Sequence, residues 1–205
     1  FGKRPTYAER INGNDIAQIN DDPNRQIGSG YDQIDVLQKF NWQAHKRLLI
    51  GANLQYSSSS NVPRYDRLTE MRNGQLRFAE WYYGPQDRVL AAITANYDAE
   101  QFWADQVRLI ISTQAIAEDR FDRSFGSPWR EESLVDVSLS AITLDAHKKL
   151  RKQSSLQYGL ELRTETVESS SLRRSLEDDT VIRDVNSRYP SKGSSLDSYS
   201  AYIQH

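Results

Sequence analysis

Cysteine is absent from the 205-residue chain, so the sequence can form neither a disulfide nor a thiolate metal site. Long apolar runs are absent as well. None approaches the ~20 residues of a membrane-spanning helix, which excludes helical spans. A strong charge of one sign is also lacking, because the net charge is -2. Such a chain has no electrostatic hold on a polyanion, and we expect no nucleic-acid partner.

The mean hydropathy is low, at -0.73, and 38% of the residues are hydrophobic. These values are typical of a soluble protein, and the length suits one domain. A transmembrane β-barrel has similar values, because only alternate residues of each strand contribute to its apolar band. Composition therefore leaves both classes open.

Apolar and polar residues alternate with a period of two through most of the chain. From Tyr31 onward, Ile34, Val36, Phe40 and Trp42 would share one face of a strand. Alternation over ten or more residues predicts strands longer than the ~5–6 residues of a typical soluble strand. We therefore predict an all-β fold, an antiparallel meander of about seven long strands.

The pattern also predicts where strands and connections lie. In chain order we expect a loop over 1–30 with a short strand near 7–11, a hairpin over 31–57, a long loop over 58–86, a hairpin over 87–118, a loop over 119–131, a hairpin over 132–167, a loop over 168–196 and the start of a strand at 197–205. Short turns are expected at 44–46, 98–101 and 145–149. The chain opens without Met and ends within a strand, so we expect a piece of a longer protein.

The predicted connections alternate between short and long. That asymmetry is typical of a transmembrane barrel with short periplasmic turns and long extracellular loops. Trp42, Tyr97 and Trp103 lie beside short turns, where an aromatic girdle would meet the membrane interface. We interpret the chain as a curved segment of a transmembrane β-barrel. The main alternative is a soluble β-sandwich that acts as a binding module or adhesin, since its strands also alternate faces. A lesser alternative is a small structural outer-membrane barrel without a transport role.

The stretch 61–86, between the second and third predicted strands, is dense in Arg, Tyr and Trp. Its candidate ligand-binding residues are Arg64, Tyr65, Asp66, Arg67, Glu80, Trp81, Tyr82 and Tyr83. Aromatic faces stack on sugars or chelate rings, and Arg pairs with carboxylates. The structural interpretation, which we favour, has Pro63 and Pro85 setting turns, Arg67 pairing with Glu80, and the aromatic residues packing the loop against a barrel rim.

Two segments of this stretch resemble the barrel region of TonB-dependent outer-membrane receptors of the Bacteroidetes type. They are 61–70, Asn-Val-Pro-Arg-Tyr-Asp-Arg-Leu-Thr-Glu, and 76–86, Leu-Arg-Phe-Ala-Glu-Trp-Tyr-Tyr-Gly-Pro-Gln. Residues 30–40 are similar to the strand that leads into this region. The resemblance covers 30–97 well, and the later strands only in general pattern.

The resemblance implies a ~22-stranded barrel in the cell outer membrane, closed by an N-terminal plug domain. It implies active uptake of a scarce ligand, such as a ferric siderophore, cobalamin or a glycan. The implied partners are the TonB energy-transducing complex, outer-membrane lipids and the ligand, and a surface lipoprotein stays open as a further partner. The sequence shows neither the plug nor the TonB box nor the family's C-terminal strand, so we expect a middle portion of the barrel.

Catalytic patterns do not stand out. No G-x-S-x-G motif occurs, and His45 and His147 fall in predicted turns without converging ligands. The spacing of Glu177, Asp178 and Asp179 matches no calcium loop. We expect no enzymatic activity, no bound metal and no cofactor.

Overall fold

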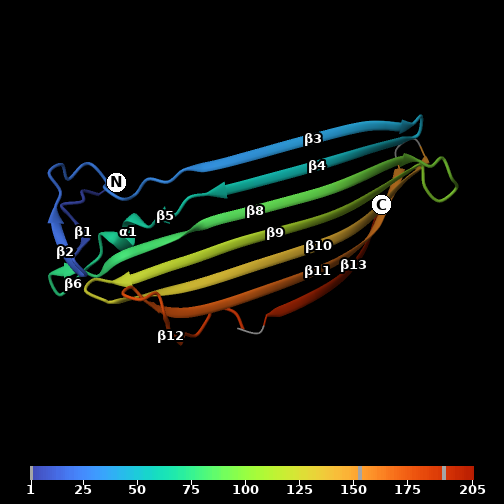
Figure 1. The fold of residues 1–205 in the computed structure, drawn as a ribbon. Coiled ribbons are helices and arrows are strands. Elements are labelled where there is room, and N and C mark those ends of the chain that lie inside the picture. Colours follow the sequence, from blue (N-terminus) through green and yellow to red (C-terminus); the bar gives the residue numbers. More distant parts are fainter. Residues whose placement is uncertain (1, 152–153, 191–192) are drawn as a thin grey trace.

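Seven long antiparallel strands form one curved sheet in the computed structural model, which describes residues 2–151, 154–190 and 193–205 (Figure 1). The long strands are β3 (Gln33–His45), β4 (Leu48–Ser59), β8 (Phe78–Asp98), β9 (Gln106–Ser124), β10 (Trp129–Arg151), β11 (Ser154–Ser175) and β13 (Ser194–Gln204). They follow one another across the sheet in chain order. The predicted antiparallel meander of long strands is therefore confirmed.

Shorter elements gather at one end of the sheet, which we call the rim; the opposite end, with the connection between β3 and β4, is the turn end (Figure 1). The rim comprises β1 (Thr6–Ile11), β2 (Asn14–Ile19), β5 (Val62–Pro63), α1 (Tyr65–Leu68), β6 (Met71–Arg72), β7 (Gln75–Leu76), β12 (Val181–Asp184) and the nearby ends of the long strands. β1 pairs with β2, β6 with β7, β5 with β8, and β12 with β11.

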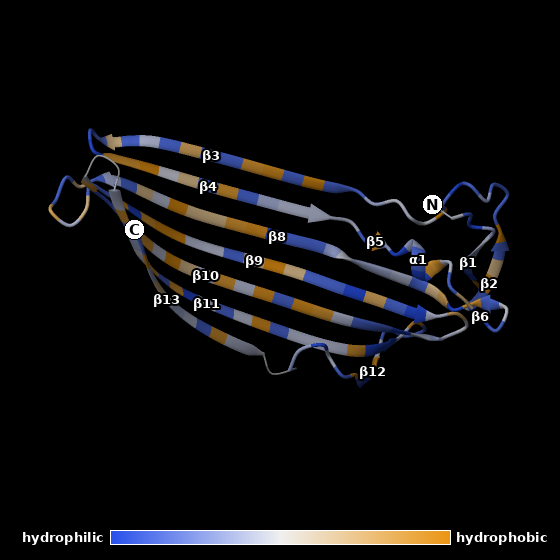
Figure 2. Ribbon diagram, turned by 180° about the vertical axis from the view of Figure 1, so that it is seen from behind, coloured by the Kyte–Doolittle hydropathy of each residue, from blue (hydrophilic) through white to orange (hydrophobic). Residues whose placement is uncertain are grey.

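The register of the ladder sorts side chains into rows on two faces. One row joins Phe40, Ala52, Ile93, Ile111, Ile142, Leu162 and Tyr199. A row of the opposite parity joins Gln43, Leu49, Asn96, Arg108, Asp145, Gly159 and Tyr202. We call these sides the apolar face and the polar face. Figure 2 shows hydrophobic and hydrophilic residues alternating along the strands.

The sheet is a single layer over most of its length. Within the described residues no second sheet or helix covers the middle of the apolar face, and Ile93 remains 58% exposed. The largest buried apolar side chains, Leu68, Leu76 and Trp81, lie at the rim instead. In the described ranges β3 pairs only with β4 and β13 only with β11, so each outer edge carries unpaired backbone groups.

The long strands extend further toward the rim than predicted. β8 begins at Phe78, so residues 78–86 of the predicted long loop are strand. The loop expected at 119–131 is also wrong, because β9 and β10 leave only residues 125–128 between them. In place of the loop expected at 168–196, β11 continues to Ser175 and β12 follows.

Several predicted turns also differ from the structure. Residues 145–149 lie inside β10, where 145–147 pair with both neighbouring strands and 148–149 with β11. The β10–β11 connection includes residues 152–153, which are outside the described ranges. The predicted turn at 98–101 is longer, since β8 ends at Asp98 and residues 99–105 lead to β9. The N-terminal loop contains a β1–β2 hairpin instead of a single short strand.

Helix is scarce. α1 spans four residues, and within the described part of the chain no helix combines the length and apolarity needed to cross a membrane.

Gly159 should be needed for packing on the polar face. A Cβ there would lie 2.5 Å from Cε1 of Tyr202 and 2.9 Å from the carbonyl oxygen of Leu144. Tyr202 crosses this glycine and donates a hydrogen bond to Asp145 at 2.9 Å. We expect Gly159→Ala to reduce the free energy of unfolding by about 1–3 kcal/mol, measured by denaturant titration.

Gly30→Ala is the matched control, because its Cβ would meet nothing within 4 Å. An unchanged unfolding midpoint for Gly159→Ala would show that the Tyr202 ring moves aside without loss.

Candidate functional site

The eight predicted ligand-binding residues occupy two neighbouring elements at the rim. Arg64 precedes α1, and Tyr65, Asp66 and Arg67 lie in it. The other four, Glu80–Tyr83, are in β8 and not in a loop. β5 pairs with β8 at Val62–Tyr83, which brings the two groups together.

Arg64 links the two groups through its guanidinium. Its Nε donates to one oxygen of Asp66 at 2.9 Å, and a second nitrogen lies 2.5 Å from the other oxygen. The guanidinium carbon is 4.8 Å from the ring centre of Trp81 and 5.9 Å from that of Tyr83. The hydrogen bond to Asp66 raises the pKa of Arg64 and lowers that of Asp66. This pair therefore stays charged while it holds α1 against β8.

The neighbouring side chains have partners within the rim as well. The Tyr65 hydroxyl donates to the carbonyl of Gly2, and Arg67 forms an ion pair with Glu70 at 3.2 Å. The expected pair of Arg67 with Glu80 is wrong. Glu80 instead accepts a hydrogen bond from Arg123 of β9.

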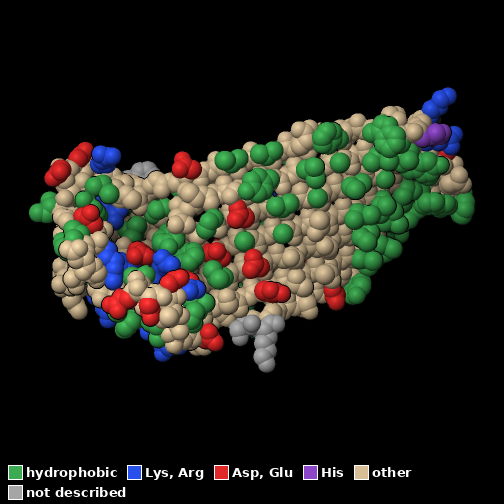
Figure 3. All heavy atoms as spheres, viewed as in Figure 1, with side chains coloured by type: hydrophobic (Ala, Val, Ile, Leu, Met, Phe, Trp, Pro, Cys, Tyr) green, Lys and Arg blue, Asp and Glu red, His purple; other side chains and the backbone are tan. Residues whose placement is uncertain are grey.

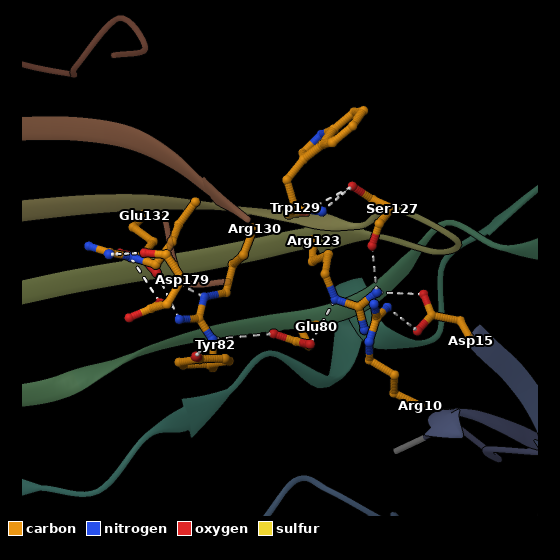
Figure 4. Close-up of polar contacts among 11 residues, drawn as sticks. Arg10, Asp15, Glu80, Tyr82, Arg123, Ser127, Trp129, Arg130, Glu132 and Asp179 are labelled. Carbon is orange, nitrogen blue, oxygen red and sulfur yellow. Dashed lines mark hydrogen bonds and ion pairs between the residues drawn. The ribbon is translucent and has the colours of Figure 1, made fainter. Parts of the chain in front are cut away.

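A buried ion cluster centred on Arg123 fastens the N-terminal hairpin to the sheet (Figure 4). Arg123 donates to Glu80 at 2.7 Å and to Asp15 of β2 at 2.6 Å. The side chains of Arg123 and Asp15 are 2% and 0% exposed, so water does not screen this pair. The amide of Gly126 also donates to Asp15, at 2.7 Å, and Arg10 approaches it at 3.5 Å.

The cluster continues across the rim through Arg130 of β10. Its guanidinium bonds Glu132 at 2.7 Å and donates to the Tyr82 hydroxyl at 3.4 Å (Figure 4). Glu132 accepts a further bond from Arg174 of β11 at 3.1 Å. Tyr82 stacks on Phe121, with ring centres 5.0 Å apart. The rim is thus connected from β2 to β11 by alternating charges. Figure 3 shows that charged side chains of both signs are gathered on the surface at this end, on the left.

Asp15 is held in its charged form. Burial opposes ionisation, but hydrogen bonds from Arg123 and Gly126 and the charges of Arg123 and Arg10 outweigh it, so the pKa of Asp15 falls below its ordinary value. Burial lowers the pKa of Arg123, but its hydrogen bonds to Asp15 and Glu80 have the larger combined effect. The pKa of Arg123 is therefore raised above its ordinary value. Both members therefore remain ionised at neutral pH.

Space for a ligand between these elements is small. A cavity of about 200 Å³ lies between the N-terminal segment and β8, with Arg4, Ile27, Leu68 and Trp81 among its walls. Pockets for substrate-sized molecules are typically about 300–1,000 Å³. Trp81, which is 8% exposed, offers little ring surface for stacking on a sugar. These residues are therefore better placed to hold the rim elements together than to bind a large ligand.

Metal-ligating groups do not converge in the described ranges, where no three His, Asp or Glu side chains form a candidate metal site. Glu177, Asp178 and Asp179 lie in the connection between β11 and β12, and Asp178 accepts hydrogen bonds from Thr180.

Asp15, Arg123 and Arg130 were missed as rim residues in the sequence. Asp15 looked like part of a polar loop, and the other two fell in or beside a predicted loop. The available signal was the close mixture of acidic and basic residues at 118–123 and 130–132, because strand pairs place opposite charges side by side.

No protein-family model matches the chain, and no curated protein sequence matches it either. The resemblance to TonB-dependent receptors therefore stays a prediction from residues 30–97.

Asp15→Asn should release the N-terminal hairpin from the sheet. The variant leaves Arg123 buried with Glu80 as its remaining carboxylate, and we expect the hairpin to open more easily by on the order of 2 kcal/mol. Hydrogen exchange of the amides in β1 and β2 measures this opening. Asp21→Asn is the control, because Asp21 is exposed in the neighbouring connection.

The same contact should depend on pH. Because the folded-state pKa of Asp15 is lowered, its contribution is fully present above the ordinary value near 3.8 and is lost as the pH falls through the lowered value. Exchange of the hairpin, corrected for the intrinsic rate, should accelerate in that acid range and less so in Asp15→Asn. If acid accelerated hairpin exchange equally in the unchanged protein and in Asp15→Asn, Asp15 would not be the cause of the pH dependence.

Proposed function

We propose that the chain forms a section of the wall of a transmembrane β-barrel in the outer membrane, as part of a TonB-dependent transporter. The observation that carries this proposal is the oblique course of the apolar band across the sheet. The band is the set of apolar residues on the apolar face of each long strand, counted from the turn end, and on β3 it is interrupted by Gln38.

The rim-side border of the band lies nearer the rim on the first strands of the sheet than on the last. On β3 the band reaches Ile34, but on β13 it stops at Tyr199, which lies in the row of Phe40. The border therefore shifts by six residues, from 34 to 40, over the six steps from β3 to β13. The shift is uneven, because the border lies in one row on β4 and β8, at Tyr56 and Val89, and in another on β10, β11 and β13. Figure 3 shows hydrophobic side chains reaching far toward the rim on the upper strands and stopping near the turn end on the lower ones.

A flat membrane crossed by tilted strands produces such a slope. Averaged from β3 to β13, the shift is one residue of about 3.3 Å for each strand spacing of about 4.8 Å, which corresponds to a tilt of roughly 35°. Transmembrane barrels have strand tilts of about 35–45°. In a soluble protein no membrane plane sets the border of an apolar face, so the slope of the border favours a lipid environment.

The height of the band is also suitable. On β8 it runs from Val89 to Tyr97, which is about 26 Å along the strand and roughly 22 Å along the membrane normal after tilting. The outward apolar band of such barrels is about 25 Å tall. Charged clusters lie beyond the rim-side border, where water would meet them.

The alternative, a soluble β-sandwich, has less support. Two sheets pack about 10 Å apart in a sandwich and bury their inner faces. Here the described residues form one large sheet with two small hairpins, and apolar residues such as Phe40, Ile93 and Leu160 stay more than half exposed. The unpaired outer edges of β3 and β13 suit a larger barrel in which further strands continue the ladder.

In this proposal the rim faces the cell exterior and the polar face lines the lumen. The motif that resembles TonB-dependent receptors then holds the rim elements together, since Arg64, Trp81 and Glu80 contact other residues of the same chain. Uptake of a siderophore, cobalamin or glycan would use the plug and other loops for selectivity. The TonB complex would act through parts of the receptor other than this sheet.

Cysteine labelling can test which face meets lipid, since the chain has no native cysteine. Ile93 and Asn96 lie on opposite faces of β8, and both are exposed. In reconstituted membranes we expect Asn96→Cys to react with a water-soluble maleimide faster than Ile93→Cys by on the order of tenfold, because an apolar environment disfavours the thiolate.

Asp21→Cys, in an exposed rim connection, sets the rate for full access to water. Equal rates for Ile93→Cys and Asn96→Cys would contradict the membrane proposal. A folded, monodisperse monomer without detergent would do the same, since the apolar face should drive aggregation.

The bracing role of the motif predicts an assembly defect. Arg64→Met removes the bidentate pair with Asp66 and the contact with Trp81, at a cost of about 1–2 kcal/mol. We expect less assembled barrel in the outer membrane, and uptake that falls only in proportion to that amount. Trp81→Leu should behave alike, and Arg67→Met, which removes exposed ion pairs, should have a smaller effect.

Quantitative blotting of membranes and ligand uptake by cells provide the two measurements. Loss of uptake with normal assembly would assign ligand binding to the motif instead.

A further inference from the structure

Arg4 carries a buried guanidinium that has no carboxylate partner. The residue is 4% exposed, although arginine is almost never buried unless it is paired. No Asp or Glu among the described residues forms an ion pair with it, and its buried Nε has no hydrogen-bond partner there. Burial lowers the pKa of Arg4, and only the Tyr65 phenol opposes that effect. Since an unpaired charge is costly to bury, this position calls for an anion.

The N-terminal segment holds this guanidinium in a defined position. The amide of Arg4 donates to the carbonyl of Pro23 at 2.7 Å, and the carbonyl of Arg4 accepts a hydrogen bond from the side chain of Asn20 at 2.8 Å. Asn20 is itself buried and also donates to the carbonyl of Arg25 at 2.8 Å. One terminal nitrogen of the guanidinium donates to the carbonyl of Ile27. The donor without a partner is therefore positioned in advance, which lowers the entropic cost of binding.

Arg4 lines the cavity of about 200 Å³ between the N-terminal segment and β8. The apolar walls of this cavity include Ile27, Pro63, Leu68 and Trp81. Glu80 also lines it, but Arg123 at 2.7 Å and Arg130 at 3.8 Å compensate that carboxylate. The volume far exceeds the ~10–15 Å³ that one water needs, and it is below the ~300 Å³ of the smallest typical ligand pockets. The cavity therefore suits a small anion with an apolar part.

We propose that this cavity binds a short-chain carboxylate such as propionate. The carboxylate accepts hydrogen bonds from the Nε edge of the Arg4 guanidinium, a planar donor that matches carboxylate geometry. The short alkyl group then lies against the apolar walls. A phosphate fits these groups less well, because its second negative charge meets no other uncompensated cation in the cavity walls. The walls come from the N-terminal segment, β5, α1 and β8, so a bound carboxylate fastens that segment to the rim.

Saturation-transfer NMR of propionate with the purified full-length protein tests the site directly. At neutral pH we expect the propionate methyl group to receive saturation from the protein. Arg4→Gln removes the charge that holds the carboxylate, and it should reduce this transfer by at least about fivefold. Arg25→Gln is the matched control, because it removes the same charge from an exposed residue of the same segment. This control should leave the transfer unchanged.

Hydrogen exchange of the β1 and β2 amides measures the effect on the segment. A ligand that binds only the closed segment slows exchange through opening by the factor 1 + [L]/Kd. Propionate at ten times its dissociation constant should therefore slow this exchange about tenfold relative to sodium chloride at equal ionic strength. Sodium phosphate should act no more strongly than chloride. Asp15→Asn loosens the hairpin but keeps Arg4, so propionate should slow its exchange by a similar factor.

Several results would overturn the proposal. They are no saturation transfer from the unchanged protein, undiminished transfer from Arg4→Gln, and equal slowing of exchange by phosphate and propionate. If Arg4→Gln opens the segment by itself, the titrations of the unchanged protein and of Asp15→Asn still decide the question. The site depends only on the geometry of the rim, so its failure would leave the barrel proposal standing, and the cysteine labelling of Ile93 and Asn96 tests that proposal separately.

Discussion

The backbone ladder between the seven long strands is the interaction on which the rest of the structure depends. It is continuous from β3 to β13, and its register places Phe40, Ile93, Ile142 and Tyr199 in one row. Because side chains alternate strictly along a strand, this register separates an apolar face from a polar one. In the described ranges no second layer covers the middle of the sheet, so the two faces call for different surroundings. In the barrel proposed above, lipid would cover the apolar face and water the polar face.

The rim is stabilised in another way. At the rim the strands extend beyond the apolar band. Neighbouring strands there contact each other through charged pairs and not through rows of apolar side chains. Arg123 joins Asp15, out of contact with water, to the partly exposed Glu80, and Arg130 and Glu132 extend the alternating charges toward β11. Burying charges is costly unless each has good partners, so such a cluster specifies one arrangement more than it adds stability. The motif at 61–86 belongs to this cluster through Glu80, which explains its density of charged and aromatic residues.

The sequence predicted the middle of the long strands well and their ends poorly. Alternation of Val, Ile, Leu and Ala signals a strand with one apolar face, and it located β3, β4 and the central parts of β8–β11. At 119–131 the apolar alternation is absent, and charged residues are mixed with Phe, Gly, Ser, Pro and Trp, which resembles loop composition. At 145–149, Asp, His and Lys suggested a turn, although Asp145 pairs with neighbours on both sides. Polar residues serve as strand formers there because they face water or cross-strand charges.

The sequence placed all eight candidate site residues in one loop, whereas Glu80–Tyr83 lie in β8, and it assigned the wrong partner to Arg67. The pairing of Arg123 with Asp15 spans 108 residues, and no local pattern specifies a contact at that distance. By itself the sequence determined the strand class, the meander order and the apolar face, because these depend on local alternation and short connections. Only the tertiary structure decided the slope of the apolar band and the rim cluster. Both depend on register between strands, which is set by the whole ladder and not by any single segment.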